Sequence, residues 1–241
     1  MNNYKIIISY DGKHFHGFQK QTSNFTVQEA IEIALDKLLN SYQLTYAGRT
    51  DSGVHARQQV LSIVTSEILK NSFKQSLNAL VGDHIFIKKI LSANKNFHPR
   101  YDARQRTYKY FINTPSNYEP YNLGHSYFIR NELKISKLNL IAESFLGKNN
   151  FTNYSKLRVD QNPFREVTTS KWTKSSQYFI YTITGNSFLH NMVRSIVGVQ
   201  LAVDEGKISI ATINTSLKTP LEERFKYVVP ADGLYLWKIK Y

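Results

Sequence analysis

The amino-acid sequence predicts an α+β protein of two similar lobes, each with a mostly antiparallel or mixed sheet flanked by helices. Strand-like and helix-like patterns alternate along the chain, and strands also follow one another directly, which favours mixed over purely parallel sheets. A basic, proline-containing connection, residues 96–105, divides the 241 residues into comparable halves. We therefore place the lobes at residues 1–103 and 104–241, with a basic cleft between them.

The first half is predicted to form a βαββαβ-like unit. Thr26 and Glu29 make a capping box, so a helix is expected to begin at Val27. Its apolar stripe predicts that it continues to about Asn40. The predicted helices cover residues 27–40 and 72–80, and the predicted strands cover residues 4–10, 44–47, 59–65 and 85–92.

The second half shows the same mixture of patterns. Tyr108, Tyr110 and Ile112 alternate along one face of a strand, and an apolar stripe from Phe188 to Val203 predicts a long helix. The predicted helices cover residues 136–146 and 188–203, and the predicted strands cover residues 106–113, 167–173, 178–184 and 234–240.

The composition indicates a polyanionic partner. Lys and Arg number 31 against 18 Asp and Glu, a formal net charge of +13, and each phosphate contact releases counterions. The 16 tyrosines suit stacking on unpaired bases. The absence of cysteine excludes disulfides, thiolate nucleophiles and cysteine-ligated metals. No apolar run approaches the roughly 18 residues of a membrane span, and no signal-peptide pattern is evident, so we expect a cytoplasmic protein.

A glycine-flanked turn, residues 48–56, is the most informative motif. It places Asp51 two residues after Arg49 and four before His55. The glycines allow backbone conformations that other residues resist and let a bulky ligand approach, so the turn can aim the Asp51 carboxylate outward. The alternative is an ordinary strand connection, in which that carboxylate bonds its own backbone.

Several common catalytic patterns are missing. The sequence has no Gly-x-Gly-x-x-Gly after a strand, no phosphate-binding loop, no His-Glu-x-x-His and no Gly-x-Ser-x-Gly. Nucleotide hydrolysis, dinucleotide redox chemistry and serine esterase chemistry are therefore disfavoured. A metal site could in principle use His14, His16, Asp51 and His55. Because Phe15 and Phe18 indicate that the histidine-bearing loop packs against the core, we predict no metal site.

Basic side chains accompany aromatic ones elsewhere. Arg100 lies in the connection between the halves, where a solvated loop and a phosphate contact are both open. Arg106 and Lys109 flank Tyr108, and a strand that buries its aromatic side chains is the alternative to base stacking there. Arg194 lies inside an otherwise apolar helical pattern. An arginine there ordinarily faces solvent, and a half-buried guanidinium that reaches for a carboxylate is the alternative.

Together these motifs resemble the TruA-type tRNA pseudouridine synthases. The resemblance follows the order of the family's motifs along nearly the whole chain. The matching residues are 10–12, 18–19, 26–29, 48–56, 106–110, 188–198 and 230–236.

The resemblance implies the pseudouridine synthase fold and an isomerase that converts uridine to pseudouridine at positions 38, 39 and 40 of the tRNA anticodon stem-loop. It also implies a homodimer that needs no metal or organic cofactor. Asp51 would be the catalytic nucleophile, and Arg194 would keep it charged. Tyr108 would stack on the target base and serve in proton transfer, while Arg49 would replace the flipped nucleotide or hold its phosphate. Further RNA contacts are assigned to Lys20, His55, Arg100, Arg106 and Lys109, with a purely structural role as the alternative for His55.

Two other functions stay open. A non-catalytic tRNA-binding module would share the charge and the aromatic residues but would not need Asp51, Tyr108 and Arg194 to converge. A metal-dependent RNA hydrolase would instead use Asp51 with the histidines considered above for a metal site.

Overall fold

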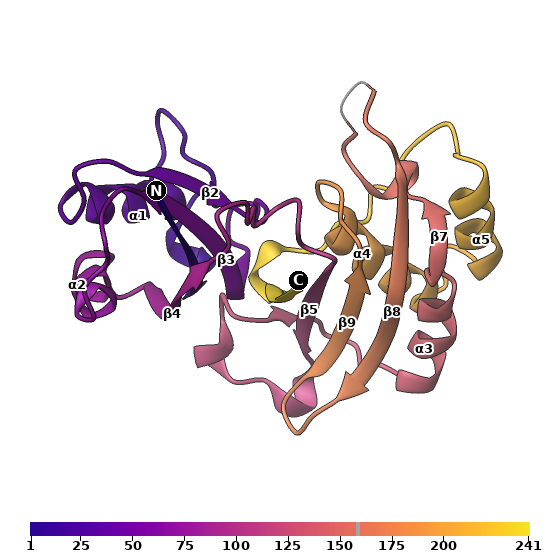
Figure 1. The fold of residues 1–241 in the computed structure, drawn as a ribbon. Helices are drawn as coiled ribbons and strands as arrows, with labels where there is room; N and C mark the ends of the chain where they lie inside the picture. The colour runs from indigo at the N-terminus through magenta and orange to yellow at the C-terminus, as the bar shows by residue number, and fades with distance from the viewer. Residues whose placement is uncertain (158–159) are drawn as a thin grey trace. The chain divides into compact units, whose positions relative to one another are not determined.

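The computed structural model describes residues 1–157 and 160–241 (Figure 1). These residues form five α-helices and ten β-strands. They divide into two compact units, one of Met1–Arg104 with Tyr235–Tyr241 and one of Gln105–Leu234. Each unit contains a mixed sheet with helices packed on it. The predicted α+β class is confirmed.

The first unit is built around a strand that pairs on both sides. β1 lies between β3 and β4 and is antiparallel to both, while β2 pairs with the opposite edge of β3. β10 pairs parallel with β3 through Tyr235 and Leu236. Tyr235–Tyr241, which include most of β10, belong to the first unit, whereas the sequence-based division placed them in the second half. The elements are β1 (Asn2–Tyr10), α1 (Val27–Asp36), β2 (Gln43–Tyr46), β3 (His55–Thr65), α2 (Phe73–Leu80), β4 (Ile85–Ala93) and β10 (Leu234–Lys240).

Helix α1 begins where the capping residues predict and ends earlier than its apolar stripe predicts. The Thr26 hydroxyl accepts a hydrogen bond from the Glu29 N–H at 3.3 Å. At the other end the N–H of Leu38 bonds to the carbonyl of Leu35, three residues back. The chain thus leaves the α-helix in a tighter turn, although Leu39 is still buried. The predicted extension to Asn40 is wrong for this reason.

In the second unit, α3 (Ile135–Glu143) and α4 (Met192–Asp204) pack on one face of the sheet. Ser170 and Trp172 alternate along β8 and therefore point to the same side. Ser170 donates to the Ala142 carbonyl on α3 at 2.7 Å, and the Trp172 indole donates to Gln200 on α4 at 2.8 Å. Figure 1 shows α4 behind β8 and β9 accordingly.

The sheet of this unit runs in the order β5, β9, β8, β7 with antiparallel pairing, and β6 lies parallel to β5. Residues with alternating burial on β5 confirm the predicted strand, since Tyr110 and Ile112 are fully buried. The elements are β5 (Gln105–Asn113), β6 (Tyr127–Phe128), α3 (Ile135–Glu143), β7 (Gly147–Asn150), β8 (Phe164–Lys174), β9 (Phe179–Gly185), α4 (Met192–Asp204) and α5 (Ile210–Lys218).

Helix α4 starts four residues later than the predicted Phe188. Asn191 adopts a left-handed φ of +63°, which no residue inside an α-helix can have, so the helix begins at Met192. A Cβ on Gly198 would lie 2.6 Å from the carbonyl oxygen of Tyr227. Glycine at this position therefore lets the segment around Tyr227 approach the helix backbone closely.

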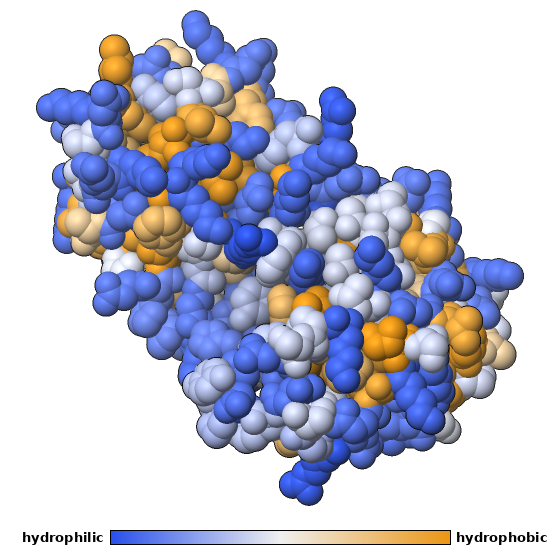
Figure 2. Space-filling view, turned by 90° about the horizontal axis from the view of Figure 1, so that it is seen from below, coloured by the Kyte–Doolittle hydropathy of each residue, from blue (hydrophilic) through white to orange (hydrophobic). Residues whose placement is uncertain are grey.

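The face of the molecule in Figure 2 is mostly hydrophilic, with small hydrophobic areas between the polar side chains. Among the described residues, no helix has the length and apolar character that crossing a membrane requires.

Candidate active site

Residues 47–54 connect β2 to β3 and carry Asp51 on a tight turn. The Asp51 carbonyl accepts a hydrogen bond from the Val54 N–H at 3.1 Å. Gly53, the third residue of this turn, has a φ of +78°, as a type II turn requires. A Cβ on Gly48 would meet no atom within 4 Å. Of the two flanking glycines, Gly53 is thus the one whose conformation the turn needs.

The end of β1 and the loop after it form hydrogen bonds with the turn. The Thr50 carbonyl accepts a hydrogen bond from the Phe18 N–H at 3.1 Å. The Thr50 hydroxyl shares a buried 2.8 Å hydrogen bond with the Tyr10 hydroxyl. Gly17 has a φ of +93°, and a Cβ there would lie 3.0 Å from the Thr50 oxygen. Asp51 itself is half-buried. These contacts fix the backbone that presents its carboxylate.

A buried histidine anchors the far end of the turn. His55 is 2% exposed, and its Nδ1 lies 3.0 Å from Oδ1 of Asp11 and 3.1 Å from the Gly12 nitrogen. The ring of Tyr235 stacks on it at 4.4 Å. A Cβ on Gly12 would overlap the Val54 carbonyl. The arrangement suits the structural role predicted as one of two for His55, and its role as an RNA contact stays a prediction.

Tyr108 and its basic neighbours lie on β5 in the second unit. Tyr108 is half-buried, and Phe188 contacts its ring edge-on at 5.1 Å. Arg106 shares this face of the strand and donates from Nη1 to the Asn186 carbonyl at 2.8 Å. Lys109 alternates with Tyr108 and therefore points to the opposite face of the sheet. The basic residues that flank Tyr108 in sequence thus face different sides.

Arg194 is held at the start of α4. Its Nε donates to the Val229 carbonyl at 2.8 Å, and its Nη1 donates to Oδ1 of Asn191 at 3.3 Å. Arg194 is half-buried. Sequence reasoning missed Asn191, because a left-handed residue before a helix leaves no periodic signal. It also missed Val229, since the close approach at Gly198 that brings this segment to the helix is a tertiary contact.

Two further predicted RNA contacts are exposed. The ammonium of Lys20 lies 2.9 Å from Oε2 of Glu32, and this hydrogen bond raises the pKa of Lys20. Arg100 lies over the ring of Tyr101 at 5.7 Å. Lys20 thus has an acidic partner within its own unit. Arg49, another predicted RNA contact, is exposed on the Asp51 turn.

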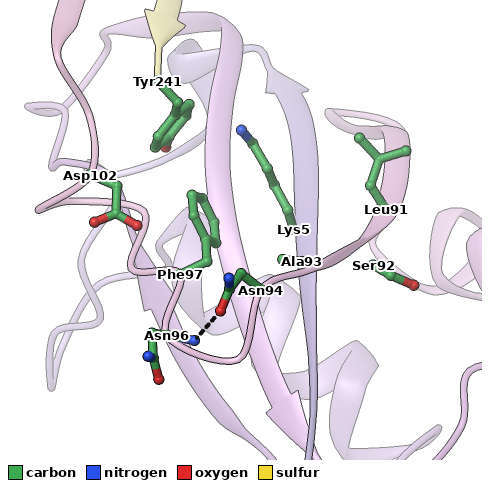
Figure 3. Close-up of a pocket in the computed structure, with 9 residues that line it drawn as sticks. All are labelled: Lys5, Leu91, Ser92, Ala93, Asn94, Asn96, Phe97, Asp102 and Tyr241. Atoms are coloured by element: carbon green, nitrogen blue, oxygen red, sulfur yellow. Dashed lines mark hydrogen bonds between the residues drawn. The ribbon is translucent and has the colours of Figure 1, made fainter.

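A pocket of about 490 Å³ opens on the first unit beside β1 and β4 (Figure 3). The ammonium of Lys5 lies 3.6 Å from the ring centre of Tyr241 and 5.0 Å from that of Phe97. Burial lowers the pKa of Lys5. The lining includes Asn94 and Asp102 but none of the predicted site residues, so the pocket is separate from the predicted chemistry.

The four residues considered for a metal site do not come together as a set. His14 lies instead with Asp11 and His84, and within the described ranges neither Asp51 nor His16 joins a group of three metal-ligating side chains. The structure thus gives no support to the metal-dependent arrangement around Asp51.

The predicted site residues are divided between the two units. The first unit holds Lys20, Arg49, Asp51, His55 and Arg100, and the second holds Arg106, Tyr108, Lys109 and Arg194. Within each unit they lie in loops and turns, at the start of β3, on the strand β5 and at the start of α4.

Comparison with known proteins gives a consistent result. Residues 6–102 and 141–241 match the family model described as tRNA pseudouridine synthase. A protein named tRNA pseudouridine synthase A from Borreliella afzelii (strain PKo) is 37% identical over 238 residues, which cover 97% of each chain. One of the same name from Francisella tularensis subsp. holarctica (strain FTNF002-00 / FTA) is 33% identical, covering all of this chain and 95% of its own.

Solved structures resemble the chain only distantly. A chain in a crystal structure of a Cbf5-Nop10-Gar1 complex aligns with 97% of this chain and 48% of its own, at 11% identity and a TM-score of 0.41. This chain thus spans about half the length of that one. The similarity is too weak to support any argument about the site.

Proposed function

The chain belongs to the tRNA pseudouridine synthase family and is an isomerase, and on that premise we propose that it modifies the anticodon stem-loop with Asp51 as nucleophile. The target uridines are those at positions 38, 39 and 40. The observation that carries this proposal is the rigidly supported turn that presents a half-buried Asp51 carboxylate. We also propose a homodimer acting on tRNA in the cytoplasm.

The reaction needs a carboxylate because the uracil must leave and return. The N1–C1′ glycosidic bond breaks, the base turns, and a C5–C1′ bond forms, after which the C5 proton is lost and N1 takes up a proton. An ionised Asp51 attacks the nucleotide and holds one of the separated fragments until the new bond forms. A side chain that only orients RNA would not need this charge.

Arg194 is proposed to keep Asp51 ionised. A guanidinium beside an aspartate lowers the pKa of that carboxyl by about 1–3 units. The hydrogen bonds of Arg194 to Val229 and Asn191 fix the fork of the guanidinium, and a fixed fork is suited to bidentate contact with a carboxylate. The proposal requires Asp51 and Arg194 to meet in the enzyme that holds tRNA.

Tyr108 and Arg49 are proposed to handle the flipped nucleotide. Tyr108 presents a half-buried aromatic ring that Phe188 contacts edge-on at 5.1 Å, and an aromatic side chain is suited to stacking on uracil. Arg49 is exposed two residues before Asp51, where a guanidinium can replace the extruded base or hold its phosphate.

The test is tritium release from tRNA carrying [5-³H]uridine. Asp51→Asn keeps the size of the side chain and removes its charge, so we expect product formation to fall to background while tRNA affinity is retained. Asp83→Asn, which removes a charge from an exposed loop of the same unit, is the matched control. An active Asp51→Asn enzyme would exclude Asp51 as nucleophile. Pseudouridine mapping of the product tRNA tests the positions independently, and modification outside the anticodon arm alone would overturn the substrate assignment.

A further inference from the structure

Three metal-ligating side chains gather in the first unit, outside the proposed catalytic set. Asp11, His14 and His84 each offer one ligand atom, and these atoms all lie within 4.8 Å of one another. Nε2 of His14 is 3.6 Å from Oδ2 of Asp11. The rings of His14 and His84 stack at 3.5 Å with 8° between their planes.

The backbone holds these residues together. Asp11 caps a short 3₁₀ helix, Gly12–His14, by accepting from the Lys13 N–H at 3.1 Å, and this turn brings His14 back beside its carboxylate. The N–H of Asp11 donates to the carbonyl of His84 at 2.9 Å. The loop before β4 is thereby tied to the end of β1. The cluster thus follows from fixed backbone contacts of all three residues.

The carboxylate is also oriented by a second layer of contacts. Oδ1 of Asp11 faces the buried His55 at 3.0 Å, while Oδ2 is the oxygen nearest His14. In metal sites the ligating carboxylates and histidines are commonly held by such outer hydrogen bonds, which set the direction of the ligand atom. The Asp11 carboxylate is held in the same way, since Oδ1 contacts His55 and Oδ2 is left to face His14.

We propose that Asp11, His14 and His84 form a binding site for a divalent transition metal of the zinc type. Two imidazoles and one carboxylate are donors that Zn²⁺ accepts, and solvent can complete four-fold coordination. Magnesium prefers an all-oxygen set and is not expected to bind here. The site goes beyond the proposed reaction, which uses no metal, and would secure the loop that supports the Asp51 turn.

A small rearrangement closes the site. Tetrahedral zinc ligands lie about 3.3 Å apart at ordinary bond lengths. The ligand atoms here are farther apart, 3.6 Å for His14 and Asp11 and up to 4.8 Å within the group. The nitrogen lone pairs of stacked imidazoles lie in parallel planes, so one ring must turn for both nitrogens to converge on the metal. Both histidines are exposed, which leaves room for this rotation and an open path for the ion.

The test is zinc binding to the full chain, prepared without a histidine tag and stripped of metal. We expect one Zn²⁺ per chain by competition with a chromophoric chelator, unaffected by excess Mg²⁺. His14→Ala and His84→Ala each remove a ligand, and we expect the affinity to fall about 10-fold or more. His16→Ala removes an exposed histidine from the same loop and is expected to bind zinc as the wild type does.

A second measurement separates ligation from loss of structure. Co²⁺ bound at four-coordinate nitrogen and oxygen ligands gives visible absorption, which should appear in the wild type and His16→Ala and be lost in His84→Ala. Circular dichroism of the metal-free variants should match the wild type. Equal zinc affinity in wild type and His84→Ala would overturn the proposal, as would equal loss in His16→Ala. Neither result would affect the assignment of Asp51, which tritium release tests separately.

Discussion

Oδ1 of Asp11 lies 3.0 Å from Nδ1 of the buried His55, and this pair connects the end of β1 to the first residue after the Asp51 turn. Tyr10, the residue before Asp11, bonds the hydroxyl of Thr50, the residue before Asp51. The turn is therefore held on both sides by one short stretch of chain. The position of the Asp51 carboxylate thus depends on residues that take no part in the proposed reaction.

Asp11→Ala is expected to destabilise the fold and slow the reaction. Removing the carboxylate deletes both its contact with Nδ1 of the buried His55 and its cap on the Lys13 N–H, and we expect the loss of the two to cost about 1–3 kcal/mol. Urea unfolding measures the stability, and tritium release measures kcat and KM. Asp83→Ala, at an exposed position, should stay within about 0.5 kcal/mol of wild type. If Asp11→Ala were as stable as this control, the pair would not support the turn.

Gly12→Ala should lower stability, whereas Gly48→Ala should not. A Cβ at Gly12 would overlap the Val54 carbonyl, whereas one at Gly48 would meet no atom within 4 Å. We expect Gly12→Ala to lower the free energy of unfolding by about 1–3 kcal/mol. Gly48→Ala should leave it unchanged or raise it by up to about 1 kcal/mol. Similar values for the two variants would contradict the close approach of Gly12 to the turn.

Local patterns predicted much of this fold. Thr26 caps α1 as its capping box indicates, and the alternation of Tyr110 and Ile112 predicts the buried face of β5. Such signals depend on neighbours within a few residues. The early start of β3 at His55 was not predictable in this way, because it pairs with Tyr235 at the far end of the chain.

In the candidate site too, sequence patterns predicted local features but not contacts between distant residues. The motif around Asp51 identifies the turn, but its supports Asp11 and Phe18 are contacts across more than thirty residues of sequence. The start of α4 was missed because Asn191 adopts a left-handed backbone, which apolar periodicity does not register. Both failures concern how a functional side chain is held, whereas the chemical types of the site residues were readable from the motifs.

Asn191 variants should separate backbone shape from the orientation of Arg194. Asn191→Gly tolerates the φ of +63° but removes the oxygen that accepts from Arg194. We expect near-normal stability and a kcat lower by about 10-fold, the equivalent of one hydrogen bond to a charged group. Asn191→Ala should show the same kcat and an added loss of about 1–2 kcal/mol in stability. A normal kcat in Asn191→Gly would show that Asn191 does not position Arg194.

Two buried tyrosines should make the protein sensitive to alkali. Burial raises the pKa of Tyr154 and of Tyr181 above the ordinary tyrosine value. Below about pH 10 both are protonated in the folded and unfolded chains, so their contribution to stability is fully present. Above that pH the unfolded chain loses these protons first, and stability falls by up to about 1.4 kcal/mol per pH unit for each tyrosine.

Urea unfolding between pH 8 and pH 11 checks this dependence. Tyr154→Phe and Tyr181→Phe should each flatten the alkaline decline, whatever their effect at pH 8. Tyr101→Phe changes a tyrosine that is 76% exposed and should leave the decline as steep as in wild type. An equal slope in all three variants would assign the decline to other groups.

The salt dependence of tRNA binding should distinguish the predicted RNA contacts from one another. Each Lys or Arg that neutralises a phosphate contributes about 0.9 to the slope of log affinity against log salt concentration. Arg49 is exposed on the Asp51 turn, and we expect Arg49→Ala to reduce the slope by about 1. The ammonium of Lys20 already lies 2.9 Å from Glu32, so contact with a phosphate would require giving up that partner. Lys20→Ala should therefore leave the slope unchanged, with affinity measured by filter binding from 50 to 200 mM salt. A reduction by Lys20→Ala equal to that by Arg49→Ala would instead mean that tRNA displaces Glu32 and that Lys20 belongs to the interface.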